Sequence, residues 1–490
     1  MSVYHSLAID LGAGSGRVIL GAFEHNNIRL KEIHRFSNEM ILVNGHYHWD
    51  TQRQMNEILK GIRLCARQEG VIPDSVGVDT WGVDFALLDS AGELLIQPFA
   101  YRDTLTDTAM DEVFSRIPPR ELYRITGIQL MPFNSLFQLW ALKQKYPALL
   151  ARAKYLLFMP DFLGYQLSGK TYAEYTIAST SQILNPYSEK WNSELLHQLE
   201  LPPDLLQTPV DPGTRVGLLK NDLSEAVQIP RIPVTTVGSH DTASAVVAIP
   251  ASHSDWAFIS SGTWSLMGIE LDEPVINDLS YRYGFTNEGG VGHKIRFLKN
   301  ITGLWLLQEC KKNWDKENNH TYEELIALAR AETPFRSLVD PDDSTFQHPT
   351  DMPAAIRRYC RKNHQPSPET PGQFTRCILE SLALKYRHTL NQLREVTGRK
   401  IEILQVIGGG SKNDLLCEMT AHSTGLRVVA GPAEGTALGN ILVQISAKGM
   451  LRDLDEMRRV VNNSVVTTTY EPRNNREWDE AYERFKKYVD

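Results

Sequence analysis

The sequence has few cysteines for its length. Five occur among 490 residues, an odd number, and they are scattered without a C-x-x-C pair: Cys65, Cys310, Cys360, Cys377 and Cys417. Neither an H-x-x-x-H nor an H-E-x-x-H spacing is present. These absences argue against a disulfide framework, a zinc site and a dithiol redox motif. We therefore expect five reduced thiols that carry no chemistry.

Long apolar runs and basic blocks are also missing. No stretch approaches the roughly 18 apolar residues of a membrane helix, and the first ten residues do not have the pattern of a signal peptide. The formal net charge is −8, and no cluster of Lys and Arg stands out. Nucleic acid and membrane partners are therefore unexpected. We predict a cytoplasmic protein that acts on small molecules and whose oligomeric state is open, with a monomer as the simplest case.

The remaining composition is that of folded protein. Hydrophobic residues make up 42% and charged residues 22%. At roughly 150 residues per domain, the length predicts two to four domains.

Two strand–turn–strand patterns lie about half a chain apart. LAIDLG runs through a Gly/Ser-rich turn into RVILGAFE, and a helical stretch and the buried-strand run SVGVDTWGVDFALLD follow. AFISSGTWSLMGIEL repeats the order in the second half. Apolar alternation of this kind indicates strands. We predict two copies of one α/β unit, as domains 1–248 and 249–490, with an insertion at about 105–205.

Three glycine turns follow apolar strands, at Gly12–Gly16, at Gly262 and at Gly408–Gly410. Exposed backbone N–H groups in such turns bind phosphates. The first turn fits neither the Walker loop nor the dinucleotide fingerprint. Its alternative is a hairpin turn whose glycines only supply positive φ. A helix expected to begin near Asn413 would direct its N-terminus at a phosphate or ribose, or would simply be capped.

Acidic residues at strand and helix ends are candidate bases. Asp241 precedes an Ala-rich helix in SHDTASAV, where it either accepts a proton from a substrate hydroxyl or caps the helix. Asp10 ends the first strand, where it either binds Mg²⁺ through water or belongs to an Asx turn. In VDTWGVDF, Trp81 offers a face for a sugar or is a core residue, and Gly82 lets a hydroxyl approach the backbone.

A set of ordered motifs resembles the FGGY carbohydrate kinase family. The motifs are DLGAGSGR, GVDTWGVDF, AYRD, MPDFLGYQLSG, SHDTASAV, SSGTWSLMG, LKNITGLWLLQ, GGGSKN and EGTALGN. The resemblance implies an α/β fold of two actin-like, ribonuclease-H-like domains, the first binding sugar and the second nucleotide. ATP and the sugar are expected to meet in the cleft between the domains.

The resemblance also implies roles for individual residues. Asp241 would be the catalytic base. The sugar would contact Gly82, His240, Asp241, Thr242 and Asn300. ATP would contact Ala13, Gly14, Ser15, Gly16, Arg17, Thr263, Gln308, Gly409 and Asn413. Asp10 would hold Mg²⁺ through water.

The implied activity is transfer of the γ-phosphoryl group of ATP to the C1 hydroxyl of a ketose, with L-rhamnulose as the expected sugar. The alternatives are a kinase for another ketose such as L-fuculose, and a sensor that binds sugar or nucleotide without turnover, since a fold alone does not fix a function. A dehydrogenase is suggested only by the first glycine turn.

Overall fold

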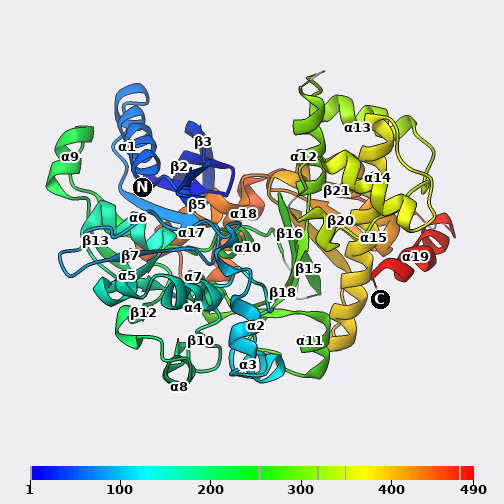
Figure 1. The fold of residues 1–490 in the computed structure, drawn as a ribbon. Helices are drawn as coiled ribbons and strands as arrows, with labels where there is room; N and C mark the ends of the chain where they lie inside the picture. Colours follow the sequence, from blue (N-terminus) through cyan, green and yellow to red (C-terminus); the bar gives the residue numbers. More distant parts are fainter. Residues whose placement is uncertain (1–2, 252–254, 317–318, 348, 474–475, 490) are drawn as a thin grey trace. The chain divides into compact units, whose positions relative to one another are not determined.

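The computed structural model of the protein describes residues 3–251, 255–316, 319–347, 349–473 and 476–489 (Figure 1). The chain forms two compact units. The first comprises Met1–Pro250, Glu270–Phe297 and Gly435–Ser464, and the second comprises Ala251–Ile269, Leu298–Glu434 and Val465–Asp490. The chain therefore returns twice to the first unit after its first segment ends. The simpler division into consecutive domains 1–248 and 249–490 stays a prediction.

The first unit is built on a six-stranded sheet with the order β13-β14-β6-β1-β2-β3. Its strands are β1 (Tyr4–Leu11), β2 (Ser15–Glu24), β3 (Asn27–Ser37), β6 (Ser75–Thr80), β13 (Arg215–Leu218) and β14 (Pro233–Thr235). β1 is antiparallel to β2 and parallel to β6. In that parallel register Asp10 stands opposite Asp79. Since side chains alternate between the faces of a sheet, the two carboxylates share one face.

Helix α1 (Thr51–Gln68) covers the opposite face. It begins after Asp50, whose side chain accepts a hydrogen bond of 3.0 Å from the backbone N of Arg53. Ile58 and Ile62, one turn apart, lie in the same buried core as Val18 of β2. This apolar stripe fixes the helix on the sheet, as the sequence pattern predicted.

Helix α17 (Gly435–Ala447) covers the face that carries the two carboxylates. It packs on β1, on β6 and on α10 (Asp241–Val247). Asn440 donates a hydrogen bond of 2.5 Å to Asp79 Oδ2, and Gln444 donates one of 3.0 Å to the carbonyl of Leu7. Figure 1 shows α17, in orange, among elements of the N-terminal half. A segment from the end of the chain thus completes the core of the first unit.

The stretch predicted as one buried strand is broken in the middle. After β6 ends, the chain turns through residues 81–84 and continues as β7 (Phe85–Leu88), which pairs with β8 (Tyr155–Phe158) in another sheet. Val83 has a φ of 70°. The buried carboxylate of Asp84 accepts hydrogen bonds from several groups, among them the indole of Trp81 at 2.9 Å. The prediction of a continuous strand was wrong because this polar centre occupies the turn.

The predicted insertion has an apolar core of its own, with Phe137 and Trp140 among its buried residues. Its helices are α2 (Ala109–Phe114), α3 (Pro119–Thr126), α4 (Ser135–Lys145), α5 (Pro147–Arg152) and α8 (Ser193–Gln198). The other elements of the first unit are β4 (Met40–Val43), β5 (His46–Trp49), α6 (Met159–Ser168), β9 (Ala173–Glu174), α7 (Tyr175–Ala178), β10 (Leu184–Asn185), β11 (Lys190–Trp191), β12 (Pro209–Val210), α9 (Asn221–Val227), α11 (Asp278–Tyr283) and α18 (Leu454–Ser464).

A second sheet has the order β17-β18-β16-β15-β19-β20-β21. Its strands are β15 (Trp256–Ser261), β16 (Trp264–Leu271), β17 (Thr286–Gly289), β18 (Ile295–Thr302), β19 (Ile403–Ile407), β20 (Arg427–Ala430) and β21 (Thr468–Tyr470). The main helices of the second unit are α12 (Trp305–Trp314), α13 (Tyr322–Ala331), α14 (Met352–Lys362), α15 (Pro371–Thr397), α16 (Asp414–Thr424) and α19 (Arg476–Val489). Along the chain, β16 and β18 run from one unit into the other.

The strand pairing of the first unit recurs in the second. β15 is antiparallel to the next strand, β16, and parallel to β19, just as β1 is antiparallel to β2 and parallel to β6. A glycine turn joins the two antiparallel strands in both cases. The predicted duplication of one α/β unit is therefore confirmed at the level of topology. Within the described residues, none of the helices has the length and apolar character to cross a membrane.

Candidate active site

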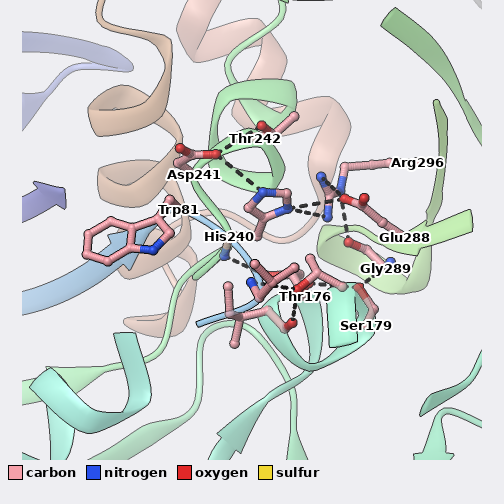
Figure 2. Close-up of polar contacts among 12 residues, drawn as sticks. Trp81, Thr176, Ser179, His240, Asp241, Thr242, Glu288, Gly289 and Arg296 are labelled. Atoms are coloured by element: carbon pink, nitrogen blue, oxygen red, sulfur yellow. Dashed lines mark hydrogen bonds and ion pairs between the residues drawn. The ribbon is translucent and has the colours of Figure 1, made fainter. Parts of the chain in front are cut away.

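Asp241 is the first residue of α10, and its side chain is 30% exposed. Its Oδ1 accepts a hydrogen bond of 3.0 Å from the hydroxyl of Thr242 and lies 3.5 Å from His240 Nε2 (Figure 2). The N-cap of α10 is His240, and its side chain makes no capping hydrogen bond. The alternative in which Asp241 caps the helix was therefore wrong, and the carboxylate remains accessible to a ligand.

His240 is held in place through its backbone by the short helix α7 and by β6. Its N–H donates to the hydroxyl of Thr176 at 3.2 Å, and the backbone N of Thr80 donates to the carbonyl of Ser239 at 2.9 Å. Glu174 accepts hydrogen bonds from Thr176 and from the backbone N of Ser239. Burial raises the pKa of Glu174 to about 7, against the opposing effect of these hydrogen bonds.

Gly82 lies beside the imidazole of His240. A Cβ placed on Gly82 would lie 3.4 Å from His240 Nε2 and 3.5 Å from Thr180 Oγ1. Without a side chain here, a ligand hydroxyl can approach both groups. Four of the five predicted sugar residues, Gly82, His240, Asp241 and Thr242, thus come together, whereas Asn300 lies on β18 in the second unit.

Trp81 packs as a core residue. Its side chain is 5% exposed, and its ring lies 4.1 Å from that of Trp49, measured between centroids. The indole nitrogens of both residues donate to Asp84 Oδ2. Of the two interpretations of Trp81, the structure supports the one in which it is a core residue.

Two further carboxylates lie on the α17 face of the first sheet. Asp10 forms an ion pair with Arg17 across the β1–β2 hairpin. Asp79 is fully buried, and its Oδ1 has no hydrogen-bond partner among the described residues. Burial raises the pKa of Asp79 well above its usual value, and the nearby charges of Asp10 and Asp241 raise it further. Three carboxylates therefore lie within electrostatic reach of one another.

The first glycine turn does not depend on positive φ. The turn joins the β1–β2 hairpin, but neither Gly12, Gly14 nor Gly16 has a φ in the left-handed region. The alternative in which these glycines only supply positive φ was therefore wrong. Gly16 is required by packing, because a Cβ there would lie 2.3 Å from the ring of Phe36. A Cβ on Gly14 would meet no described atom within 4 Å. The space above Gly14 suits the approach of an anion to the backbone of residues 13–17.

A second group of predicted ligands forms in the second unit. The hydroxyl of Thr263, in the β15–β16 turn, donates a hydrogen bond of 3.0 Å to Gln308 Oε1 on α12. The third glycine turn packs against the end of β15, where a Cβ on Gly410 would lie 2.0 Å from Ser261 Oγ. Gly409 has open space and no positive φ. The predicted nucleotide residues of this unit are thus gathered around the end of β15.

Asn413 is the N-cap of α16, as expected. Its Oδ1 accepts a hydrogen bond of 3.0 Å from the backbone N of Leu416. Capping therefore occupies this side-chain oxygen, and a nucleotide contact by Asn413 stays a prediction.

Several residues around His240 were not found from the sequence. Glu288 and Arg296 contact its imidazole. Glu174 accepts a hydrogen bond from the backbone N of the preceding residue, Ser239, and Thr176 accepts one from the backbone N of His240. They lie on β17, β18, β9 and α7, far from the SHDT motif in sequence. The only local signal is the presence of charged residues in apolar strands, which are rarely buried unless paired.

Comparison with known proteins identifies the class. The model for the N-terminal domain of the FGGY family of carbohydrate kinases matches residues 5–248, and that for the C-terminal domain matches residues 257–447. The solved structure of gluconate kinase from Lactobacillus acidophilus covers 100% of this chain and 97% of its own, with a TM-score of 0.80 at 16% identity. The solved structure of glycerol kinase from Plasmodium falciparum with ADP has a TM-score of 0.79 at 16% identity, and the match covers 99% of this chain and 98% of the glycerol kinase chain. The fold is the actin-like, ribonuclease-H-like two-domain fold of sugar kinases.

Curated relatives are similar over almost the whole chain. A rhamnulokinase from Bacteroides thetaiotaomicron is 48% identical over 98% of this chain and 99% of its own length. A rhamnulokinase from Enterococcus faecalis is 42% identical over 95% of this chain and 94% of its own length. The chain belongs to the FGGY family of carbohydrate kinases and is a phosphotransferase.

Proposed function

We propose that the protein transfers the γ-phosphoryl group of ATP to the C1 hydroxyl of L-rhamnulose, giving L-rhamnulose 1-phosphate and ADP. The observation that carries this proposal is the accessible carboxylate of Asp241 beside Gly82 and His240 Nε2. A sugar hydroxyl can reach all three there. The choice of sugar is supported by the relatives, which are rhamnulokinases at 48% and 42% identity over nearly their full length.

Asp241 acts as the base. A carboxylate is ionised at neutral pH, so it orients the hydroxyl and takes its proton as the oxygen–phosphorus bond forms. His240 and Thr242 stand beside it as sugar ligands, and Asn300 is a further one. Proton acceptance of this kind contributes about 10²- to 10⁴-fold to rate.

The two glycine-rich groups of ligands supply phosphate contacts. Ala13, Gly14, Ser15, Gly16 and Arg17 offer backbone N–H groups and one guanidinium to the phosphates. The other proposed nucleotide ligands, which belong to the second unit, are Thr263, Gln308, Gly409 and Asn413. Aligned donors of this type stabilise the charge that develops during phosphoryl transfer.

The residues present fit a magnesium ion. Mg²⁺ is held by one or two carboxylates, waters and substrate phosphates rather than by a complete protein cage. Asp10, with the buried and unpartnered Oδ1 of Asp79 opposite it in register, is such a donor set. When bound, the ion neutralises charge on the phosphate oxygens. Asp10 holds it through water in this proposal.

The substrate is tested with a panel of sugars. L-rhamnulose, L-fuculose, D-xylulose and glycerol are offered with Mg-ATP, and ADP release is measured by a coupled assay. We expect the highest kcat/KM with L-rhamnulose and a phosphate ester at C1 by phosphorus NMR. A higher kcat/KM with L-fuculose assigns the other ketose. ATP hydrolysis that no sugar stimulates favours the sensor and rejects the kinase.

The role of Gly409 gives a separate prediction. Because a Cβ there would meet no described atom within 4 Å, Gly409→Ala leaves the fold intact and adds a methyl group in the open space that the proposed nucleotide would use. We expect KM for ATP to rise about tenfold, roughly the loss of one good contact, with an unchanged melting temperature. Steady-state kinetics at saturating sugar and a thermal melt measure both. An unchanged KM for ATP would remove Gly409 from the nucleotide site.

A further inference from the structure

The two ring nitrogens of His240 face different groups. Nε2 faces Asp241 Oδ1 at 3.5 Å and the open position above Gly82. Nδ1 faces Arg296 Nη2 at 3.1 Å and Glu288 Oε2 at 3.2 Å (Figure 2). The ring is buried, with 8% of the side chain exposed. Water therefore does not decide where its proton lies.

Arg296 is fixed so that it can only donate to Nδ1. Its side chain is fully buried, its Nε donates to the carbonyl of Gly289 at 2.9 Å, and its Nη1 lies 3.1 Å from Glu288 Oε2. Burial lowers the pKa of Arg296, and the Glu288 carboxylate opposes this effect. A guanidinium has donors and no acceptor and stays protonated in proteins. With Nη2 at 3.1 Å, a hydrogen on Nδ1 would face another hydrogen.

The two approaches to Nδ1 differ in geometry. That of Arg296 Nη2 is a hydrogen bond, whereas Glu288 Oε2 lies near both Nδ1 and Arg296 Nη1 as an ion-pair partner and makes no hydrogen bond among the described residues. Burial would raise the pKa of Glu288, but Arg296 and His240 bring it below its usual value. The carboxylate thus remains charged, and its role at this site is to hold the guanidinium.

We infer that Arg296, anchored by Glu288, keeps His240 neutral with its single proton on Nε2, directed at Asp241 and the sugar. Arg296 and Glu288 are then positioning residues. His240 has no lone pair available on the substrate side, so it donates to the sugar and cannot act as a base. Asp241 then faces a neutral hydrogen-bond donor rather than an imidazolium, and it remains the group that accepts the proton of the sugar hydroxyl. This division of roles rests on the proposed function.

The charged groups around His240 determine how the ring is protonated once Arg296 is removed. They are Asp241 on its own helix, Glu288 on β17, and Arg296 on β18, with Glu174 of β9 behind its backbone. Without the guanidinium, both ring nitrogens face carboxylates. The structure therefore predicts that Arg296→Gln protonates Nδ1. The new positive charge pairs with Glu288 and also with Asp241.

The test combines nitrogen NMR with kinetics. Protein labelled with ¹⁵N-histidine is studied without substrate at pH 8, and His240 is assigned by its loss in His240→Asn. We expect an unprotonated Nδ1 and a protonated Nε2 in the native protein and in Glu288→Gln, which retains the arginine. Arg296→Gln shows a protonated Nδ1, because the neutral amide of glutamine can offer its oxygen to that hydrogen, and Arg296→Lys, which keeps a positively charged donor without an acceptor, restores the native pattern.

The kinetic result separates positioning from a structural effect. Arg296→Gln lowers kcat about tenfold, because an imidazolium paired with Asp241 competes with the sugar hydroxyl for the carboxylate. KM for the sugar changes less, and Arg296→Lys recovers most of kcat. A protonated Nδ1 in the native protein, or the same NMR pattern in Arg296→Gln, overturns the inference. If the protein phosphorylates no sugar but shows the expected NMR pattern, the proposed function is wrong and the assignment of the proton to Nε2 stands.

Discussion

Asp241→Asn lowers kcat with L-rhamnulose by about a thousandfold, within the range that a positioned base contributes. The amide has the shape of the carboxylate and can still accept the hydrogen bond from Thr242, now 3.0 Å to Oδ1. It cannot accept the proton of the sugar hydroxyl. We therefore expect sugar affinity, measured by calorimetry, to change little while turnover collapses in the coupled assay.

A matched change elsewhere in the first unit controls for loss of charge. Asp222 is exposed in the first turn of α9, a helix that packs against α1 on the opposite face of the sheet, and Asp222→Asn removes one negative charge there. Its kcat and melting temperature are expected to stay at native values. Asp241→Asn with native kcat would remove Asp241 from the reaction and leave the proposed mechanism without a base.

Local sequence patterns predicted the parts of the fold that local forces determine. Alternating apolar residues placed β1 and β2, and helical spacing placed α1 after them. The break at residues 81–84 was not visible in this way. It depends on Asp84, whose hydrogen-bond donors include Trp49 and Gln138, from a strand and a helix elsewhere in the chain. Hydrogen bonds between residues so far apart in the chain leave no periodic pattern in the sequence.

The candidate site also has one part that the sequence predicted and one part that it did not. The SHDT motif and the turn at Gly82 are short, so their residues were recognised together and lie together in the structure. Glu288 and Arg296 reach His240 from strands that are close only after folding. Apart from the presence of a charged residue in a strand, their own neighbourhoods do not distinguish them from surface charges. The parts that hold a functional side chain are thus harder to predict than the side chain itself.

Gly439→Ala has the largest expected effect on stability. α17 crosses α10 at this residue, and a Cβ there would lie 1.7 Å from the carbonyl oxygen and 2.5 Å from the carbonyl carbon of Ser244. These are backbone atoms of the helix that begins with Asp241, so no side chain can rotate away. The two helices must separate. Overpacking of this kind costs about 3 kcal/mol, and we expect the melting temperature to fall by roughly 5–10 °C.

The same substitution at an open position is the control for this prediction. Gly409→Ala adds an identical methyl group where no described atom lies within 4 Å, and its melting temperature is expected to stay native. Because α17 also supports β1 and β6, separation of α17 from α10 moves Asp241 relative to Asp10 and Asp79. Gly439→Ala should therefore lose kcat as well as stability, even below its melting temperature. A native melting temperature in Gly439→Ala would mean that the two helices do not meet backbone to backbone, and α17 would then not fix the position of Asp241.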